Sequence, residues 1–213
     1  MTDKLIRTAQ AVLKALEGRQ PRKLHAPQSR RASVLMPLVD RGQNVEVLFT
    51  KRTTHLPHHA GQISFPGGAS DPEDNGASFT ALRETCEEIG VCEGLVQVVT
   101  RLDQVLTVTD FLVTPYLGLV DPAARFTPNP VEVDHLILVP LAKVLDQGSW
   151  GPHEVHWQGM SFIQEGLAHD GEVIWGATAR MLLNLRQALG QEAEAVISAA
   201  SPEKDMDSKG GLG

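Results

Sequence analysis

The stretch of sequence that decides the expected fold runs from Phe65 to Val91 and reads FPGGASDPEDNGASFTALRETCEEIGV. It joins a glycine pair and a turn-rich loop to a segment that is dense in carboxylates. At about 100° per residue, Ala77 to Ile89 forms an amphipathic helix. Either Asn75 or Ser78 is expected to cap its start, and Gly90 stands where a left-handed residue ends a helix.

Three glutamates, Glu84, Glu87 and Glu88, follow the i, i+3, i+4 spacing and therefore fall on one face of this helix. Carboxylates this close repel one another and hold their protons more tightly unless a cation lies among them. Divalent ions such as Mg²⁺ and Mn²⁺ favour clustered carboxylate oxygens, so this face is a candidate metal site. The glutamates alone leave open a second interpretation, an acidic face exposed to solvent. The expected core-facing positions are Phe79, Leu82, Cys86 and Ile89.

The residues around these glutamates form a recognisable pattern. In chain order they are Gly68, Arg83, Glu84, Glu87, Glu88, Gly90 and Val91. This pattern resembles the Nudix box, the signature of hydrolases that cleave a diphosphate linked to another group. Two positions depart from the usual box: Thr85 replaces an aliphatic residue, and the upstream acid is Asp74, one residue further from Arg83 than usual.

Segments on either side of the box resemble the coenzyme A pyrophosphatase branch of the Nudix family. They are Leu48 to Thr53, Gly61 to Gly68 and Ile174 to Leu182. Members of this branch also carry the longer box with an aspartate at its first acidic place. Pro57 stands where the branch often has an arginine, and His135 stands where some relatives have a second glutamate.

The resemblance implies the Nudix fold, and the order of strands and helices predicts the same architecture: an α+β fold, arranged as an α/β/α sandwich. A mixed β-sheet would lie between helices, with the box as a loop–helix–loop segment against it. The sequence predicts a helix and linker over 1–31, the hydrolase domain over 32–190, and a partly disordered tail over 191–213. Within the domain, the expected elements include a hairpin of 33–39 and 45–51, strands at 95–107, 111–119 and 133–139, a hairpin around Gln158-Gly159, and a helix over 175–189.

The resemblance also implies roles for individual residues. Metal ligands are expected at Glu84, Glu87, Glu88 and the carbonyl of Gly68. Arg83 is expected to hold the glutamates in place through a salt bridge, since Arg83 and Glu87 are spaced i, i+4. Glu132 is a possible further acid from a later loop. The substrate-binding residues implied are Arg52, His59, Gln62 and Phe65, in or beside a loop expected to contact the coenzyme A end of the substrate rather than the metals.

The implied activity is metal-dependent hydrolysis of coenzyme A or its derivatives, which gives 4′-phosphopantetheine (or its acyl form) and 3′,5′-ADP. The required cofactor would be Mg²⁺ or Mn²⁺. An alternative substrate is another nucleoside diphosphate derivative such as ADP-ribose. A non-catalytic ligand sensor on the same fold is a third interpretation, which the three retained glutamates disfavour.

Composition limits the other functions. The 213 residues carry a net charge of −7, which disfavours general nucleic-acid binding. Charges interrupt the first helix, so neither a secretion signal nor a membrane span is expected, and the expected location is cytoplasmic. The two cysteines, Cys86 and Cys92, are too few for a disulfide framework and are interpreted as small hydrophobic residues. A zinc site at His55, His58 and His59 is a weak alternative, and a homodimer through the first helix and the sheet edge is left open.

Overall fold

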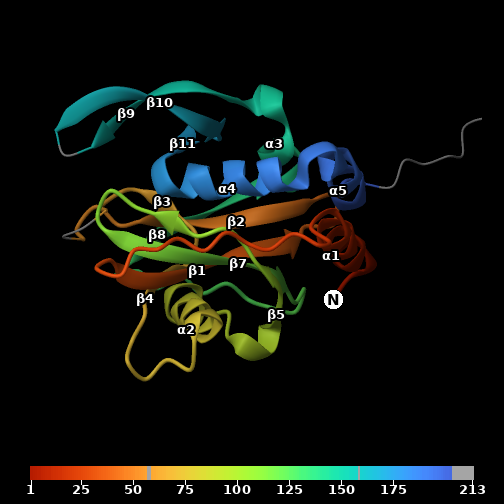
Figure 1. Cartoon of the computed structure of the whole chain (residues 1–213), viewed down its shortest axis with the longest axis horizontal. Helices are drawn as coiled ribbons and strands as arrows, with labels where there is room; N and C mark the ends of the chain where they lie inside the picture. The colour runs from red at the N-terminus through yellow and green to blue at the C-terminus, as the bar shows by residue number, and fades with distance from the viewer. Residues whose placement is uncertain (57–58, 158, 203–213) are drawn as a thin grey trace, which may run out of the picture.

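The computed structural model describes residues 1–56, 59–157 and 159–202. Within these residues, eight strands form one mixed sheet and three further strands form a separate antiparallel sheet. Helices cover both faces of the mixed sheet (Figure 1). The expected α+β fold, an α/β/α sandwich, is therefore confirmed.

The helices, including the short 3₁₀ helices labelled η, are α1 (Asp3–Ala15), α2 (Ala77–Ile89), η1 (Glu93–Leu95), α3 (Leu141–Leu145), η2 (Gln147–Ser149), α4 (Gly176–Leu189), η3 (Gly190–Glu192) and α5 (Ala193–Ala200). The strands of the mixed sheet are β1 (Arg30–Asp40), β2 (Val45–Arg52), β3 (Ile63–Ser64), β4 (Gly67–Ala69), β5 (Val96–Arg101), β6 (Val105–Leu106), β7 (Phe111–Val120) and β8 (Val133–Pro140). The strands of the smaller sheet are β9 (Trp150–Trp157), β10 (Met160–His169) and β11 (Glu172–Ile174).

Strand β1 lies in the middle of the mixed sheet. It pairs in parallel with β7, with Leu38 opposite Leu119, and antiparallel with β2, with Leu38 opposite Val47. Eight consecutive residues of β1, 32–39, are buried. Such a continuous buried run is expected of a strand covered on both faces, and it explains why the sequence lacks polar–apolar alternation here.

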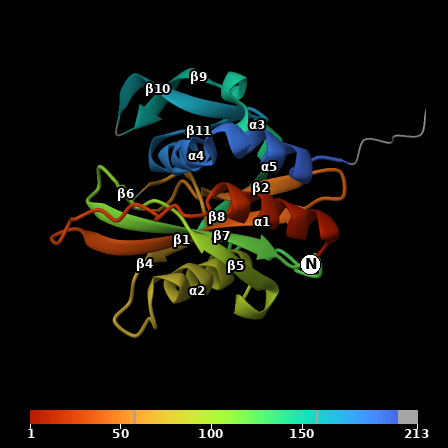
Figure 2. The ribbon, with the colours of Figure 1, turned by 45° about the vertical axis from the view of Figure 1, so that its right-hand side comes forward.

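The two faces of the mixed sheet have separate cores. On one face, α2 packs over a small cluster consisting of Val39, Leu48, Ile89, Val91 and Val120. The larger core on the other face includes apolar side chains of α1, α4 and α5. Helices α1 and α5 lie side by side in both ribbon views (Figures 1 and 2). The box helix α2 is therefore held on its own face of the sheet, opposite the terminal helices.

Several sequence predictions can be compared with these elements. The hairpin of β1 and β2, strand β8 and helix α4 are confirmed. The single strand expected over 95–107 is wrong, because β5 ends at Arg101 and β6 begins at Val105. Between them, the carboxylate of Asp103 accepts hydrogen bonds from the Arg19 guanidinium at 2.6 and 3.0 Å and from the Arg22 amide at 2.7 Å. This anchoring of the segment after α1 interrupts the strand.

The hairpin of β9 and β10 is also confirmed, with Trp157 opposite Met160, while Gln158 lies outside the described residues. The sequence did not indicate that these strands form a sheet of their own, completed by β11. The hairpin of that sheet, β9 and β10, lies beyond α4 (Figure 1), whereas β11 contacts β3 of the mixed sheet. In the described residues, no helix is long and apolar enough to cross a membrane.

Candidate active site

The turn before α2 is organised by Asp74. Gly76 occupies the N-cap position with φ of 98° and without a side-chain cap, so the expected cap at Asn75 or Ser78 is wrong. Instead, one oxygen of Asp74 accepts hydrogen bonds from the Asp71 amide at 2.9 Å and from the Thr80 hydroxyl at 2.7 Å. The box helix therefore starts from a turn closed by an aspartate six residues before Thr80.

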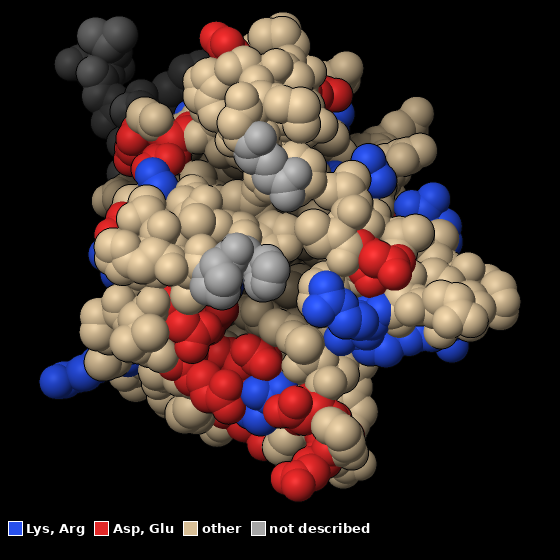
Figure 3. Space-filling view, turned by 90° about the vertical axis from the view of Figure 1, so that its left-hand side faces the viewer, with Lys and Arg blue, Asp and Glu red and all other residues tan. Residues whose placement is uncertain are grey.

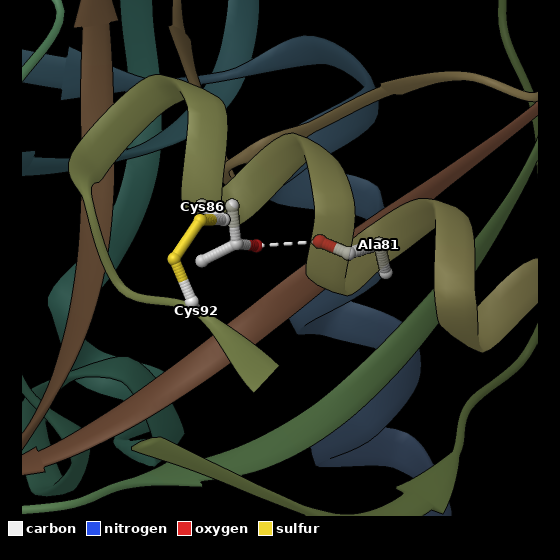
Figure 4. The surroundings of a disulfide bond; sticks show 4 residues. Ala81, Cys86 and Cys92 are labelled. Carbon is white, nitrogen blue, oxygen red and sulfur yellow. Dashed lines mark hydrogen bonds between the residues drawn. A yellow bond between two sulfur atoms is a disulfide. The ribbon is translucent and has the colours of Figure 1, made fainter. Parts of the chain in front are cut away.

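The buried face of α2 differs slightly from the expected one. Leu82 and Ile89 are buried as predicted, but Phe79 is 39% exposed. Ala81 and Thr85 are completely buried. Thr85 satisfies its hydroxyl by donating to the carbonyl of Ala81 at 2.6 Å (Figure 4). A bond within the helix thus allows threonine at a position where the Nudix box usually has an aliphatic residue.

Arg83 links the box helix to the preceding turn. Its Nε donates to one oxygen of Asp74 at 2.9 Å and its Nη2 to the other at 3.2 Å. Its Nη1 lies 2.9 Å from Glu84 and 3.2 Å from Glu87, so the expected salt bridge to Glu87 is present. Figure 3 shows acidic side chains gathered around a basic one on this side of the molecule. The bond from Arg83 also holds the pKa of Asp74 well below its usual range.

Glu88 is the most buried glutamate of the box, with 2% exposure. Its Oε1 lies 3.6 Å from Nη1 of Arg52, at the end of β2, and its Oε2 is buried without a hydrogen-bond partner. Burial raises the pKa of Glu88 to about 8 against the opposing effect of Arg52, and the charges of Glu132 and Glu84 raise it further. Charging this buried carboxylate therefore costs free energy that Arg52 does not fully offset.

Glu132 reaches the site from the loop between β7 and β8. The Thr53 amide, which directly follows Arg52, donates to the Glu132 carbonyl at 2.9 Å. The Asn129 amide donates to the carbonyl of Glu88 at 2.8 Å. These two backbone bonds fix the loop between the end of β2 and the end of α2. Glu132 therefore acts electrostatically on both Glu88 and Glu84, although it is distant from them in sequence.

Gly68 of strand β4 lies directly beneath Glu84. A Cβ atom at this position would be 2.4 Å from both Cδ and Oε2 of Glu84. Glycine is therefore required for the carboxylate to rest against the strand. Burial raises the pKa of Glu84, Arg83 opposes this rise, and the charges of Glu87 and Glu132 add to it.

The carboxylates have the chemistry of a divalent-cation site, although they are not drawn together around one point. In the described part of the chain, no three His, Cys, Asp or Glu side chains form a ready-made metal-binding group. Glu84 and Glu87 instead contact Arg83, whereas Glu88 and Glu132 lie near Arg52 and Asn129. The partnerless oxygen of Glu88, close to the carboxylates of Glu84 and Glu132, is the observation that fits a divalent cation at this site.

The other residues predicted for the site lie in two places. His59 donates from Nδ1 to the side-chain oxygen of Gln62 at 2.8 Å, and its Nε2 lies 3.4 Å from the Thr109 hydroxyl, so the two predicted residues form one unit at the turn before β7. Phe65 is 1% exposed and stacks on Phe49, which places it in the core rather than on the surface. Pro57 and His58 lie outside the described residues.

The end of β2 carries two basic side chains, Arg52 and Lys51, with different partners. Arg52 was expected to contact the coenzyme A end of the substrate rather than the metals, and its side chain lies 3.6 Å from Glu88, one of the expected metal ligands. The alternation of side chains at the end of β2 explains this, because Lys51 points to the other side and pairs with Glu172. His135, opposite Lys51 in β8, joins that second group, 3.7 Å from Glu172.

The structure also contains a disulfide that the sequence interpretation missed. Cys86 and Cys92 are bonded, so their interpretation as small hydrophobic residues is wrong. Cys92 is exposed rather than buried. The left-handed Gly90, with φ of 74°, reverses the chain and returns Cys92 to the last turn of α2. The spacing of two cysteines across a predicted helix-ending glycine was the available signal.

Comparisons with known proteins show what the chain is similar to. A model of the NUDIX domain matches residues 29–158. An uncharacterized Nudix hydrolase NudL from Yersinia pestis (strain Pestoides F) is 35% identical over 159 residues, which cover 75% of this chain and 79% of that protein. The NudL of Yersinia pseudotuberculosis serotype I (strain IP32953) matches over the same extent.

Among solved structures, a NUDIX hydrolase from Alicyclobacillus acidocaldarius has a TM-score of 0.48 and 18% identity, covering 82% of this chain and 97% of that one. The NUDIX domain of Shewanella oneidensis NrtR, complexed with ADP ribose, has a TM-score of 0.44 and 20% identity, covering 68% of this chain and 87% of that one.

Proposed function

This chain belongs to the Nudix hydrolase family, and we propose that it hydrolyses the diphosphate linkage of coenzyme A or its derivatives in the presence of Mg²⁺ or Mn²⁺. The observation that carries the proposal is the contact of Arg52 with Glu88 at 3.6 Å. Arg52 belongs to the segment that resembles the coenzyme A branch, and Glu88 belongs to the box. A contact between the segment that resembles this branch and the box supports the proposal that both act in one site.

The oxygens of Glu84, Glu87, Glu88 and Glu132, with the carbonyl of Gly68, would hold the divalent ion. A bound ion supplies positive charge to the diphosphate and lowers the pKa of water. The formal charge of the protein is −7, so an anionic substrate needs such local positive charge. Arg52 adds a side-chain cation at the edge of the carboxylates.

Two residues of the chain, Asp74 and Arg83, prepare the glutamates for this role. Asp74 fixes the Arg83 guanidinium through two hydrogen bonds, and Arg83 in turn positions Glu84 and Glu87. In the reaction, a water oxygen bonds to phosphorus, the bond from phosphorus to the bridging oxygen breaks, and a carboxylate of the group accepts the water proton. The products are 4′-phosphopantetheine and 3′,5′-ADP.

The substrate class is tested by competition. Hydrolysis rates are measured with coenzyme A, its 3′-dephospho form and ADP-ribose, alone and as mixtures, with Mg²⁺ or Mn²⁺. We expect the highest kcat/KM with coenzyme A and a clear loss when the 3′-phosphate is removed. A preference for ADP-ribose would replace this proposal by the alternative, a hydrolase of another nucleoside diphosphate derivative.

A further inference from the structure

The Cys86–Cys92 disulfide lies within the box helix and its following turn, on the side away from the glutamates. Cys86 directly precedes Glu87, and its carbonyl accepts the Gly90 amide at 2.9 Å, the bond that ends α2. Cys92 follows the turn, and its carbonyl accepts the Leu95 amide at 2.8 Å, which starts η1. The disulfide therefore joins the two ends of the turn after α2 (Figure 4).

The turn that the disulfide holds also positions an acid of the site. The last carbonyls of α2, those of Glu88 and Ile89, accept hydrogen bonds from the amides of Asn129 and Thr127, both at 2.8 Å. These bonds dock the loop that carries Glu132. The end of α2 therefore connects three features: the disulfide, Glu88 and the loop that carries Glu132.

The disulfide is accessible to small molecules. Cys92 is exposed and Cys86 is partly buried, with a Cα–Cα distance of 4.3 Å. The bond closes a sequence separation of only six residues, so it constrains the unfolded chain less than a long-range disulfide would. Its main physical consequence is therefore local, at the turn after α2.

We propose that Cys86 and Cys92 form a reversible thiol-exchange site for small thiols, and that its oxidation state sets the order of the α2 end and the turnover of the site. A small thiolate bonds to the sulfur of Cys92, the exposed residue of the pair, and Cys86 leaves as a thiolate. A second small thiol then releases Cys92. In balance, two small thiols and the protein disulfide give two protein thiols and one small disulfide.

The activity part of this inference rests on the proposed function, because coenzyme A is itself a small thiol. Free coenzyme A would therefore reduce the bond while it is being hydrolysed. An acyl ester of coenzyme A, whose sulfur is blocked, separates the two events and is the substrate of choice for the test.

The full-length protein is equilibrated in buffers of defined dithiothreitol redox ratio and compared with the Cys92→Ser variant. Free cysteines are counted by alkylation and mass measurement, and hydrogen exchange is followed at the Thr127 and Asn129 amides. On reduction, the wild type should expose two thiols, exchange these amides faster and turn over the acyl ester about 2- to 30-fold more slowly. The Cys92→Ser variant should show the fast exchange and the low turnover at every redox ratio.

The three readouts separate the possible failures. Two alkylated cysteines in the absence of reductant, or identical exchange and turnover in both states, would overturn the inference. Redox-dependent exchange in a protein that cleaves no form of coenzyme A would support the thiol-exchange site and overturn the proposed function alone.

Discussion

Replacing Glu88 by glutamine removes one buried negative charge while keeping the size of the side chain. In the metal-free protein, burial raises the pKa of Glu88 to about 8 from its usual 4.5, so charging it opposes folding. As the pH rises, the unfolded chain releases this proton before the folded protein does. The stability contributed by the protonated group is fully present below about pH 4.5 and is lost as the pH approaches 8.

The size of the effect follows from this difference in pKa. Each pH unit in this interval lowers the free energy of unfolding by about 1.4 kcal/mol, because the unfolded state binds one proton fewer. At pH 7, the loss amounts to about 3 kcal/mol. Glu88→Gln removes this loss of stability and should therefore raise the melting temperature in excess chelator by up to about 6–12 °C. A weaker dependence of stability on pH should remain in the variant, since burial also raises the pKa of Glu84.

The assay is thermal or denaturant unfolding at several pH values from 5 to 8 in excess chelator, in parallel with turnover of coenzyme A with Mg²⁺ or Mn²⁺. Activity should fall by roughly 10²–10⁴ in Glu88→Gln, the scale expected for a metal-orienting or acid–base group. The stabilisation produced by added metal should also shrink, because ligand binding to the native state stabilises it. Glu93→Gln, at an exposed glutamate just after the same helix, is the matched control and should change stability by less than about 0.5 kcal/mol.

Two results would refute this reasoning. The first is a Glu88→Gln variant that folds normally and turns over coenzyme A at the wild-type rate, since the Glu88 carboxylate would then take no part in metal binding or in the reaction. The second is equal stability of wild type and variant in chelator across the whole pH range, since the carboxylate would then carry no cost of burial.

Three other changes test the surroundings of Glu88. Gly68→Ala should lower turnover roughly 10–100-fold with little loss of stability, because the added methyl displaces the flexible Glu84 carboxylate. Its control is Gly94→Ala, where no atom lies within 4 Å of the added carbon. Equal turnover of the two variants would argue against a role for the Gly68–Glu84 contact. Arg52→Ala should raise the KM for coenzyme A by about 10–100-fold without weakening Mn²⁺ binding, because it removes a cation; weaker Mn²⁺ binding at unchanged KM would count against this. Asp74→Asn should lower kcat and destabilise the protein, since it removes the charge that fixes Arg83; unchanged kcat would show that Arg83 is positioned without it.

The parts of the site that the sequence predicts well depend on local chemistry. The period of the α2 pattern places Glu84 and Glu88 on one helix, and Gly90 ends it in the left-handed conformation because glycine has no Cβ to oppose that geometry. The β1–β2 hairpin follows from two apolar runs and a turn signal close in sequence. The identity of the family rests on the same local spacing of residues.

The parts that the sequence leaves undetermined depend on contacts between distant segments. No local pattern could show that the Thr53 amide donates to the Glu132 carbonyl, or that Arg52 rather than Lys51 faces Glu88. Strand pairing and side-chain direction decide both contacts. Phe79 is exposed although the helical period favoured its burial, since the sheet covers a narrower part of α2 than the pattern implied. The separate sheet of β9 to β11 is likewise a matter of long-range pairing.

The most direct test of the account is product analysis after the protein is incubated with coenzyme A, with Mg²⁺ or Mn²⁺ and in excess chelator. The account predicts 4′-phosphopantetheine and 3′,5′-ADP in equal amounts when metal is present and neither product in chelator, because the carboxylates of the site supply no positive charge of their own. Equal turnover in chelator, or no cleavage of any form of coenzyme A with either metal, would contradict it.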